Sequence, residues 1–321
     1  MALLCVPKVK RSMTCTDSVE PRVYRSIFLD HRWAHQRYLG WAVVEELAGL
    51  RILQKGHAIF DRYLMLLTKG GEAALEEAIT RFAGRAGLSD IFIHDFDHAL
   101  TDAPVLAGFR FRRAERHERL LNIATFAVDL QRDEATIFAS MSSNYRRQIR
   151  KAEATGLNIN AHPRPDAALC DGFFSAYVDL AHERGLQAPD PAVIKAMYAA
   201  GDAVLFVASR DGEISNYLHV YIAGETGVFM HGVNLSKVND GAGQYLHWQA
   251  MRHLKAHGRD WYDLGGVATL DPADGIFNFK EKFGAMFVPL GVEWRYTGSV
   301  VRRAISARAT IGRLAARRVR S

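Results

Sequence analysis

The chain has 321 residues, of which 49% are hydrophobic and 24% are charged, and this length and composition predict two domains with ordinary buried cores. No run approaches the roughly 18 apolar residues of a membrane span, and the N-terminus, MALLCVPKVKRSMTCTDS, lacks the apolar segment of a secretory signal. We therefore expect a soluble, cytoplasmic protein. The three cysteines, Cys5, Cys15 and Cys170, and the histidines follow no disulfide or metal-binding spacing, so we expect no structural metal.

The formal net charge of +6 is concentrated at the C-terminus, because residues 299–321 carry seven arginines and no acid. Aliphatic residues alternate with these arginines at near-helical spacing, which predicts a basic amphipathic tail. Such a helix could lie on RNA, on an anionic membrane surface at the inner face of the membrane, or on its own domain. The sequence leaves these three alternatives open.

The first half is expected to contain a mobile leader over residues 1–20 and a mixed α/β domain over 21–140. Its pattern favours antiparallel strands first and one helical crossover later. The expected elements are a short helix around 30–38, strands at 41–46, 51–60 and 62–68, a helix over 72–86, strands at 91–94 and 125–130, and a helix over 133–141.

A basic helix, MSSNYRRQIRKAEATG, is predicted next, within a linking segment over residues 141–160. Ser142 or Ser143 can cap its start, and Gly156 ends it. Its expected buried stripe is Tyr145, Ile149 and Ala152.

Like charges stand four residues apart on this helix, at Arg146 and Arg150 and at Arg147 and Lys151, and each pair costs about 0.2–0.5 kcal/mol unless an acid or a polyanion lies between them. The helix is therefore either a solvated connection between domains or a binding surface for a polyanion.

The second domain is expected over residues 161–298, with helices before a three-stranded meander. The expected elements are helices over 166–185 and 191–200, strands at 203–209, 214–222 and 227–233, a helix over 241–258, a strand at 261–264, a short helix before Gly284, and a strand at 288–296.

The stretch from Gly241 to Gly284 organises this half. Its helix starts on Gly241 and Gly243 and buries Leu246, Ala250 and Leu254, and Gly265 and Gly266 are expected to give the following strand a tight exit. Helices, antiparallel meander, helix, strand, helix and strand is the order of the acyltransferase fold called GNAT, in which a strand end and a helix N-terminus hold an acyl donor. We predict an α/β protein of two tandem GNAT-like domains, each a mixed, mostly antiparallel sheet flanked by helices.

Four segments carry a resemblance to one family: FLDHRWAHQRYLGW, IFIHDFDH, NYRRQIRKAEATGLNI, and AMRHLKAHGRDWYDLGG followed by GIFNFKEKFG. From about Tyr24 to Tyr296 the chain resembles the Fem family of peptidoglycan-bridge aminoacyltransferases, which are built from two GNAT-like domains. The basic helix motif also occurs in related GNAT-like proteins of polysaccharide and lipid pathways.

The resemblance implies transfer of an aminoacyl group from aminoacyl-tRNA, a co-substrate, to an amine on a cell-wall precursor, with no bound cofactor. Lys280 falls on the functionally important lysine of F-K-x-x-F-G and is expected to contact the terminal phosphate or ribose of the donor, with Phe279 walling the channel. Gly241 and Gly243, at the helix start, are further donor-binding candidates. The basic side chains of Arg147, Arg150 and Lys151 are expected to bind the donor RNA.

On the acceptor side the resemblance points to Arg37, near the family's lysine, and to Asp95, at the position of a family aspartate, with Phe96 in place of the usual proline. Alternation along the meander places Tyr217 and His219 on one face, where they are candidate acceptor contacts. His231, from the next strand, and Asp263, which could orient an amine, are candidate catalytic groups.

Two alternatives remain at this stage. An acyl-CoA N-acyltransferase would carry [RQ]-x-x-G-x-[GA] at the helix start, and here Gly241 and Gly243 are present whereas Val238 occupies the Arg or Gln position. A non-catalytic protein that binds RNA or a membrane would use the basic helix and tail alone.

Overall fold

The computed structural model describes residues 24, 26–29, 40–56, 60–82, 88–100, 104–186, 188–235 and 240–304. The leader expected at 1–20, the helix expected around 30–38 with Arg37, and the tail from 305 onward lie outside the described residues. Within the described part of the chain, no helix has both the length and the apolarity needed to cross a bilayer.

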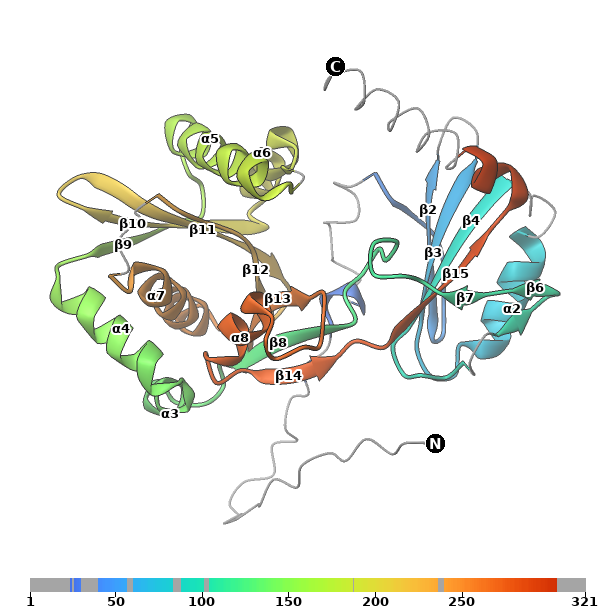
Figure 1. The fold of residues 1–321 in the computed structure, drawn as a ribbon, viewed down its shortest axis with the longest axis horizontal. Coiled ribbons are helices and arrows are strands. Elements are labelled where there is room, and N and C mark those ends of the chain that lie inside the picture. The colour runs from blue at the N-terminus through green and yellow to red at the C-terminus, as the bar shows by residue number, and fades with distance from the viewer. Residues whose placement is uncertain are drawn as a thin grey trace, which may run out of the picture.

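Two mixed sheets, each flanked by helices, make up the fold (Figure 1). The first sheet has the strand order β1 (Ala42–Leu47), β2 (Leu50–Gly56), β3 (Asp61–Leu67), β4 (Ser89–Asp95), β15 (Val292–Thr297) and β7 (Arg112–Arg113). The helix α2 (Glu72–Phe82) connects β3 to β4, which pair in parallel, and a small hairpin is formed by β5 (Val105–Leu106) and β6 (Phe109–Arg110).

The second sheet has the order β14 (Met286–Pro289), β8 (Ala124–Asp129), β13 (Trp261–Val267), β12 (Thr226–Asn234), β11 (Glu213–Ala223), β10 (Ala203–Arg210) and β9 (Asn158–His162). On one face lie α3 (Glu134–Ser140), α4 (Ser143–Ala154), α7 (Ala242–Ala256) and α8 (Gly275–Glu281), and on the other lie α5 (Ala167–Arg184) and α6 (Pro191–Ala200) (Figure 1). A single turn of 3-10 helix, η1, spans Ile27–Leu29.

The two domains repeat one connection. In the first, β3, α2 and β4 form a parallel crossover, and in the second β12, α7 and β13 do the same, whereas the other described strand pairs are antiparallel. Side chains alternate across the second sheet: Leu218 and Val220 pack toward α4 and α7, and Tyr217 and Tyr221 pack toward α5 and α6. The predicted fold class, two tandem GNAT-like domains with mixed sheets, is confirmed.

The structure divides the strands differently from the boundaries predicted at residues 140 and 298. The strand β8, expected in the first domain, pairs with β13 and β14 of the second sheet, and β15 pairs with β4 of the first sheet. The strand expected at 288–296 is interrupted at Gly291, whose φ is +92° and whose added Cβ would lie 1.9 Å from the Asp95 carbonyl oxygen. The chain turns there because only glycine permits that approach, and it crosses from one sheet to the other.

The predicted linking helix is α4, and it belongs to the second domain instead of connecting the two. Its cap and stripe are as predicted: the Ser142 hydroxyl accepts from the Tyr145 amide, and Tyr145, Ile149 and Ala152 are buried. These three side chains join the core between the second sheet and α7, which explains the placement because a helix with a buried stripe requires a surface to cover it.

The crossing strand β15 is held by a buried ion-pair network. The Asp90 carboxylate is fully buried and accepts from the Arg295 Nε at 2.8 Å and from the Arg62 Nε at 2.9 Å. Removal of one partner of such a network leaves uncompensated buried charge.

We predict that Asp90→Ala lowers the free energy of unfolding by about 3–5 kcal/mol, because two guanidinium groups lose their shared acceptor. Urea unfolding monitored by circular dichroism measures the loss. Asp171→Ala is the matched control, because Asp171 pairs with Lys195 at the surface and its loss costs much less. Equal losses in the two variants would contradict the importance of the buried network.

Candidate active site

The candidate site forms where β12 and β13 stop pairing. Their parallel ladder is confined to Thr226–Trp261, Gly227–Tyr262 and Val228–Asp263. Immediately beyond, the β11–β12 register shifts between His219 and Val220, and the β13–β8 register shifts between Asp263 and Gly266. Bulges bend strands and end pairing. Beyond Val228 and Asp263, β12 and β13 therefore continue but no longer pair with each other.

The prediction that the strand ends at Leu264 with a tight exit at Gly265 and Gly266 is wrong, because β13 continues through both glycines to Val267. Gly265 has a φ of +80°, and an added Cβ on Gly266 would lie 2.1 Å from the Asn122 side chain. The glycine pair therefore makes a bulge within the strand and lets the segment before β8 approach closely.

Lys280 fills the space that this bulge creates. Asp274 caps α8 by accepting from the amides of Ile276 and Phe277, and the side chain of Lys280 points inward with only 6% of its surface exposed. The Nζ donates to the carbonyl oxygens of Gly265 and Gly266, each at 2.8 Å. Burial lowers the pKa of Lys280 to about 8, against the opposing charges of Asp263 and Asp274.

Asp263 is placed beside this lysine and is also buried. Its carboxylate accepts from the Tyr24 and Thr125 hydroxyls and, at 2.7 Å, from the Gly265 amide. Burial raises the pKa of Asp263, and these hydrogen bonds and the charge of Lys280 oppose the rise. Asp263 thus holds the backbone of Gly265 by its amide, and the carbonyl oxygen of the same residue accepts from Lys280, which makes Asp263 a positioning group in this structure.

His247, on α7, was missed by the sequence reasoning. It is 5% exposed, and its Nδ1 lies 2.7 Å from the Tyr262 hydroxyl. Burial, with the charge of Lys280, lowers the pKa of His247 to about 3, so its imidazole is neutral at physiological pH. The weak available signal was its position directly after Leu246 in the predicted buried stripe.

Aromatic side chains surround His247 and Lys280. The ring of His247 lies 4.8 Å from that of Phe229, 5.5 Å from Phe279 and 5.0 Å from Phe283, measured between centroids. The Tyr145 hydroxyl donates to the Phe279 carbonyl oxygen at 3.2 Å, and burial raises the pKa of Tyr145 to about 12. Phe279 therefore packs against His247 and Phe283 beside Lys280, and its expected role as a channel wall stays a prediction.

The histidines of the meander lie on the opposite face of the sheet, against α5 and α6. His219 is fully buried and its Nδ1 lies 2.7 Å from the Tyr198 hydroxyl, and its ring stacks on His231 at 5.5 Å. Tyr217 packs on Phe173 in the same core cluster. The alternation thus brings Tyr217, His219 and His231 together as expected, but it separates them from Lys280, and their roles stay predictions.

Asp95 ends β4 in the first sheet, away from this cluster. Its carboxylate is buried and accepts from the amides of Ala99 and Leu100 at 2.9 and 2.8 Å. In this arrangement Asp95 caps the following loop, and its expected contact with an acceptor stays a prediction.

The basic side chains of α4 are divided between two environments. Arg146 donates to the carbonyl oxygens of Ala139 and Met141 at the end of α3, which offsets its repulsion with Arg150. Arg147, Arg150 and Lys151 are exposed, with the Arg150 guanidinium 5.2 Å from the centre of the Phe138 ring. These three cations form one solvent-facing surface on α4.

The two glycines at the start of α7 have different surroundings. Gly241 has a φ of +85°, and an added Cβ would lie 2.2 Å from the Gln148 carbonyl oxygen. Gly243 has no atom within 4 Å of its added Cβ. Gly241 is therefore required by the approach of α7 to α4, whereas Gly243 leaves the helix start open. Within the ranges that the structure describes, no group of three or more His, Cys, Asp or Glu side chains is arranged to hold a metal ion.

Comparisons with known proteins agree with this geometry. Residues 139–281, which contain α4, the meander, α7 and Lys280, match the family model of the acetyltransferase (GNAT) domain. No curated protein sequence matches the chain.

Solved structures show the same fold at low sequence identity. A crystal structure of FemX is 14% identical, covers 82% of this chain and 90% of its own, and has a TM-score of 0.61. L-PGS from Bacillus licheniformis is 14% identical over 88% of this chain and 92% of its own, and the C-terminal domain of a putative lysylphosphatidylglycerol synthetase from Agrobacterium fabrum is 15% identical over 84% and 88%, each with a TM-score of 0.54. These findings support a coarse assignment as an acyltransferase of the GNAT fold.

We predict that Gly241→Ala lowers the free energy of unfolding by at least about 2 kcal/mol, because alanine is strained at positive φ and its Cβ meets the Gln148 backbone. Gly243→Ala is the control and should raise stability by about 0.5–1 kcal/mol, as alanine does within a helix. Thermal and urea unfolding compare the variants. A tolerated Gly241→Ala would show that α7 can start without this close contact.

The lowered pKa of Lys280 also predicts that the free energy of unfolding depends on pH. Its pKa falls from 10.5 to about 8 on folding, so between these pH values the unfolded chain binds more protons and stability rises with pH by an amount on the order of 3 kcal/mol from this group. Below pH 8 the cost of the buried charge is present in full. Lys280→Met should remove this rise, whereas Lys69→Met, at an exposed turn, should keep it. Unfolding free energies across this pH range test the difference.

Proposed function

We propose that the protein transfers an aminoacyl group from aminoacyl-tRNA to an amine of a cell-wall precursor or related peptide, by direct aminolysis of the ester. The observation that carries this proposal is the buried, cationic Lys280 at the end of the β12–β13 ladder, within the F-K-x-x-F-G motif that resembles the Fem family. The similarity in fold to FemX supports it.

The chemistry fits the groups at this site. An aminoacyl ester is already activated, so the protein has mainly to align a neutral amine with the ester carbonyl and stabilise the developing oxyanion. The amine nitrogen forms the new C–N bond, the C–O bond to the ribose breaks, and the proton lost by the amine goes to the ribose oxygen. With a pKa of about 8, Lys280 is mostly charged at neutral pH, and an ammonium has three N–H groups, two of which bind the described carbonyl oxygens. The third can bind a donor phosphate or ribose oxygen.

The exposed cations of α4 suit a nucleic-acid donor. Arg147, Arg150 and Lys151 lie on the helix whose Tyr145 is bonded to Phe279, next to Lys280. A solvent-facing basic surface can provide phosphate contacts that position an RNA without reading its sequence. The basic tail could add a peripheral membrane contact at the inner face of the membrane.

The acyl-CoA N-acyltransferase remains the second candidate, because the acetyltransferase (GNAT) model matches residues 139–281 and Gly243 leaves the start of α7 open. Against it, Val238 stands where the pyrophosphate loop of such enzymes has Arg or Gln.

We predict that purified protein, given a pool of charged tRNAs and candidate amine acceptors, deacylates one aminoacyl-tRNA only when its acceptor is present. Lys280→Met should slow this transfer by about 10²–10³-fold, since it removes the charge beside the reacting ester. Lys282→Met, two residues along and without those contacts, should retain most activity. Release of free CoA from acyl-CoAs, with charged tRNA unaffected, would contradict the aminoacyl-tRNA proposal and favour the second candidate.

A further inference from the structure

Tyr24 precedes the first sheet in the chain but packs on the second. Its side chain is 7% exposed, and its ring lies edge-on to that of Trp261, with 5.5 Å between the centroids. Ala127 and Val288 complete this small core cluster, so Tyr24 contacts β8, β13 and β14 together. Tyr24 therefore covers one face of the last strands of the second sheet.

Lys280 approaches the same strands from the opposite face. Its helix α8 packs in the core cluster that contains Tyr262, whereas the preceding residue of β13, Trp261, faces Tyr24. Successive side chains of a strand point to opposite faces, so the sheet lies between Tyr24 and Lys280. An influence of one on the other has to pass through the backbone of the strands.

Asp263 provides that connection. The Tyr24 hydroxyl donates to its Oδ2, and the Thr125 hydroxyl and the Gly265 amide donate to its Oδ1. The Gly265 carbonyl oxygen in turn accepts from the Lys280 Nζ at 2.8 Å. The Tyr24 hydroxyl is thus joined to the ammonium by hydrogen bonds from hydroxyl to carboxylate, from amide to carboxylate, and from ammonium to carbonyl oxygen.

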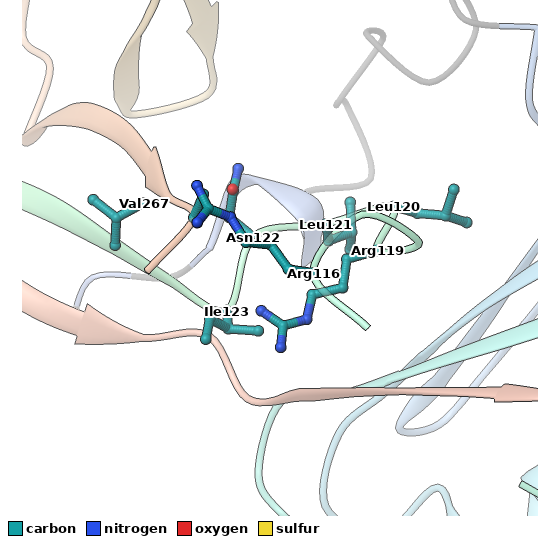
Figure 2. A pocket seen from close by; sticks show the side chains of 8 residues that line it. Arg116, Arg119, Leu120, Leu121, Asn122, Ile123 and Val267 are labelled. Atoms are coloured by element: carbon teal, nitrogen blue, oxygen red, sulfur yellow. The ribbon is translucent and has the colours of Figure 1, made fainter. Parts of the chain in front are cut away.

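Hydrogen bonds have to hold this part of β13, because the packing around it is incomplete. A cavity of about 100 Å³ lies beside the bulge, and Asn122 and Val267 are among the side chains that line it (Figure 2). A glycine has no side chain to anchor it, and a neighbouring cavity leaves atoms without van der Waals contacts on one side. The position of the Gly265 carbonyl oxygen therefore depends on the carboxylate that binds the amide of the same residue.

The segment that carries Tyr24 also contacts the first domain. Ile27 is 6% exposed and belongs to a core cluster that includes Leu53 and Leu64 of the first sheet. This short segment is thus packed on both domains, which limits how far Tyr24 can move away from Asp263.

We propose that Tyr24 is a positioning residue of the transfer reaction: its hydroxyl holds the Asp263 carboxylate, and through the Gly265 backbone it sets the position of the Lys280 ammonium. This role rests on the proposed transfer function, to which it adds a residue that acts through others. Loss of the hydroxyl leaves a buried carboxylate oxygen without that donor and lets the carboxylate shift, which weakens its remaining hydrogen bonds. The segment before the first sheet is then a working part of the active site.

Tyr24→Phe tests this role, because it removes the hydroxyl and keeps the ring that packs on Trp261. Hydrogen exchange of the Gly265 amide, followed by NMR without substrate, should become about tenfold faster relative to amides of β11, which report on global opening. Tyr63→Phe is the matched control, since it removes the same group from a buried tyrosine of the first sheet, and it should leave this ratio unchanged.

The transfer assay separates positioning from general destabilisation. Tyr24→Phe should lower kcat by about tenfold and change the KM of the acceptor little, because the displaced ammonium acts at the reacting ester. In a Lys280→Met background the same substitution should have no further effect, since its influence passes through Lys280. A residue with a purely structural role would add its full loss to that of Lys280→Met.

Unchanged Gly265 exchange in Tyr24→Phe, or an equal loss of kcat with and without Lys280, would overturn the proposal. Thr125→Val removes the other hydroxyl donor of the Asp263 carboxylate and should also speed Gly265 exchange, so the connection stays testable if Tyr24→Phe does not fold. Faster Gly265 exchange in a protein without transfer activity would refute the proposed function and support the hydrogen-bonded connection.

Discussion

The early end of the β12–β13 ladder is the constraint on which the candidate site depends. A parallel pair that stops at Val228 and Asp263 leaves half-buried peptide groups beyond it that require other partners. The carbonyl oxygens of Gly265 and Gly266 obtain theirs from Lys280, which fixes the distance of α8 from the sheet. The irregularity of the sheet therefore selects a cation for this position, since an apolar side chain would leave both oxygens unpaired.

A buried ammonium is costly, and Asp263 is what makes it tolerable. Burial lowers the pKa of Lys280 and raises that of Asp263, and each charge opposes the shift of the other. The two side chains do not pair directly: the Asp263 carboxylate accepts from the Gly265 amide and the Lys280 Nζ donates to the Gly265 carbonyl oxygen, so the backbone of one residue, Gly265, lies between the charges. His247 remains neutral at this site, and so it adds no charge that would compete with Lys280.

The sequence predicted local structure better than it predicted strand partners. Caps and periodicity are local signals, and the stripe of Tyr145, Ile149 and Ala152 is buried as expected. The sheet that β8 or β15 joins depends on contacts with residues far away in the sequence. The alternation of apolar and polar residues along a strand identifies its buried face but does not specify those contacts. At the site, the F-K-x-x-F-G motif singled out Lys280, whereas His247 was not identified because a buried histidine in the stripe of an amphipathic helix has no distinguishing spacing.

The strand β15 follows the second domain in the chain but pairs with β4 of the first sheet, and this pairing determines how the two domains are held together. The chain passes between them at residues 114–123 and again at Leu290 and Gly291, and the two crossings are bonded together: the buried Glu293 carboxylate accepts from the amides of Leu120 and Leu121 at 2.8 and 3.1 Å. Opening the interface would remove both amide donors from that carboxylate and leave it the His94 ring, whose Nδ1 lies 3.4 Å away, which is costly for a buried carboxylate. The segment at residues 114–123 is thus fixed against β15 because that strand joins the first sheet after the chain has passed through the second.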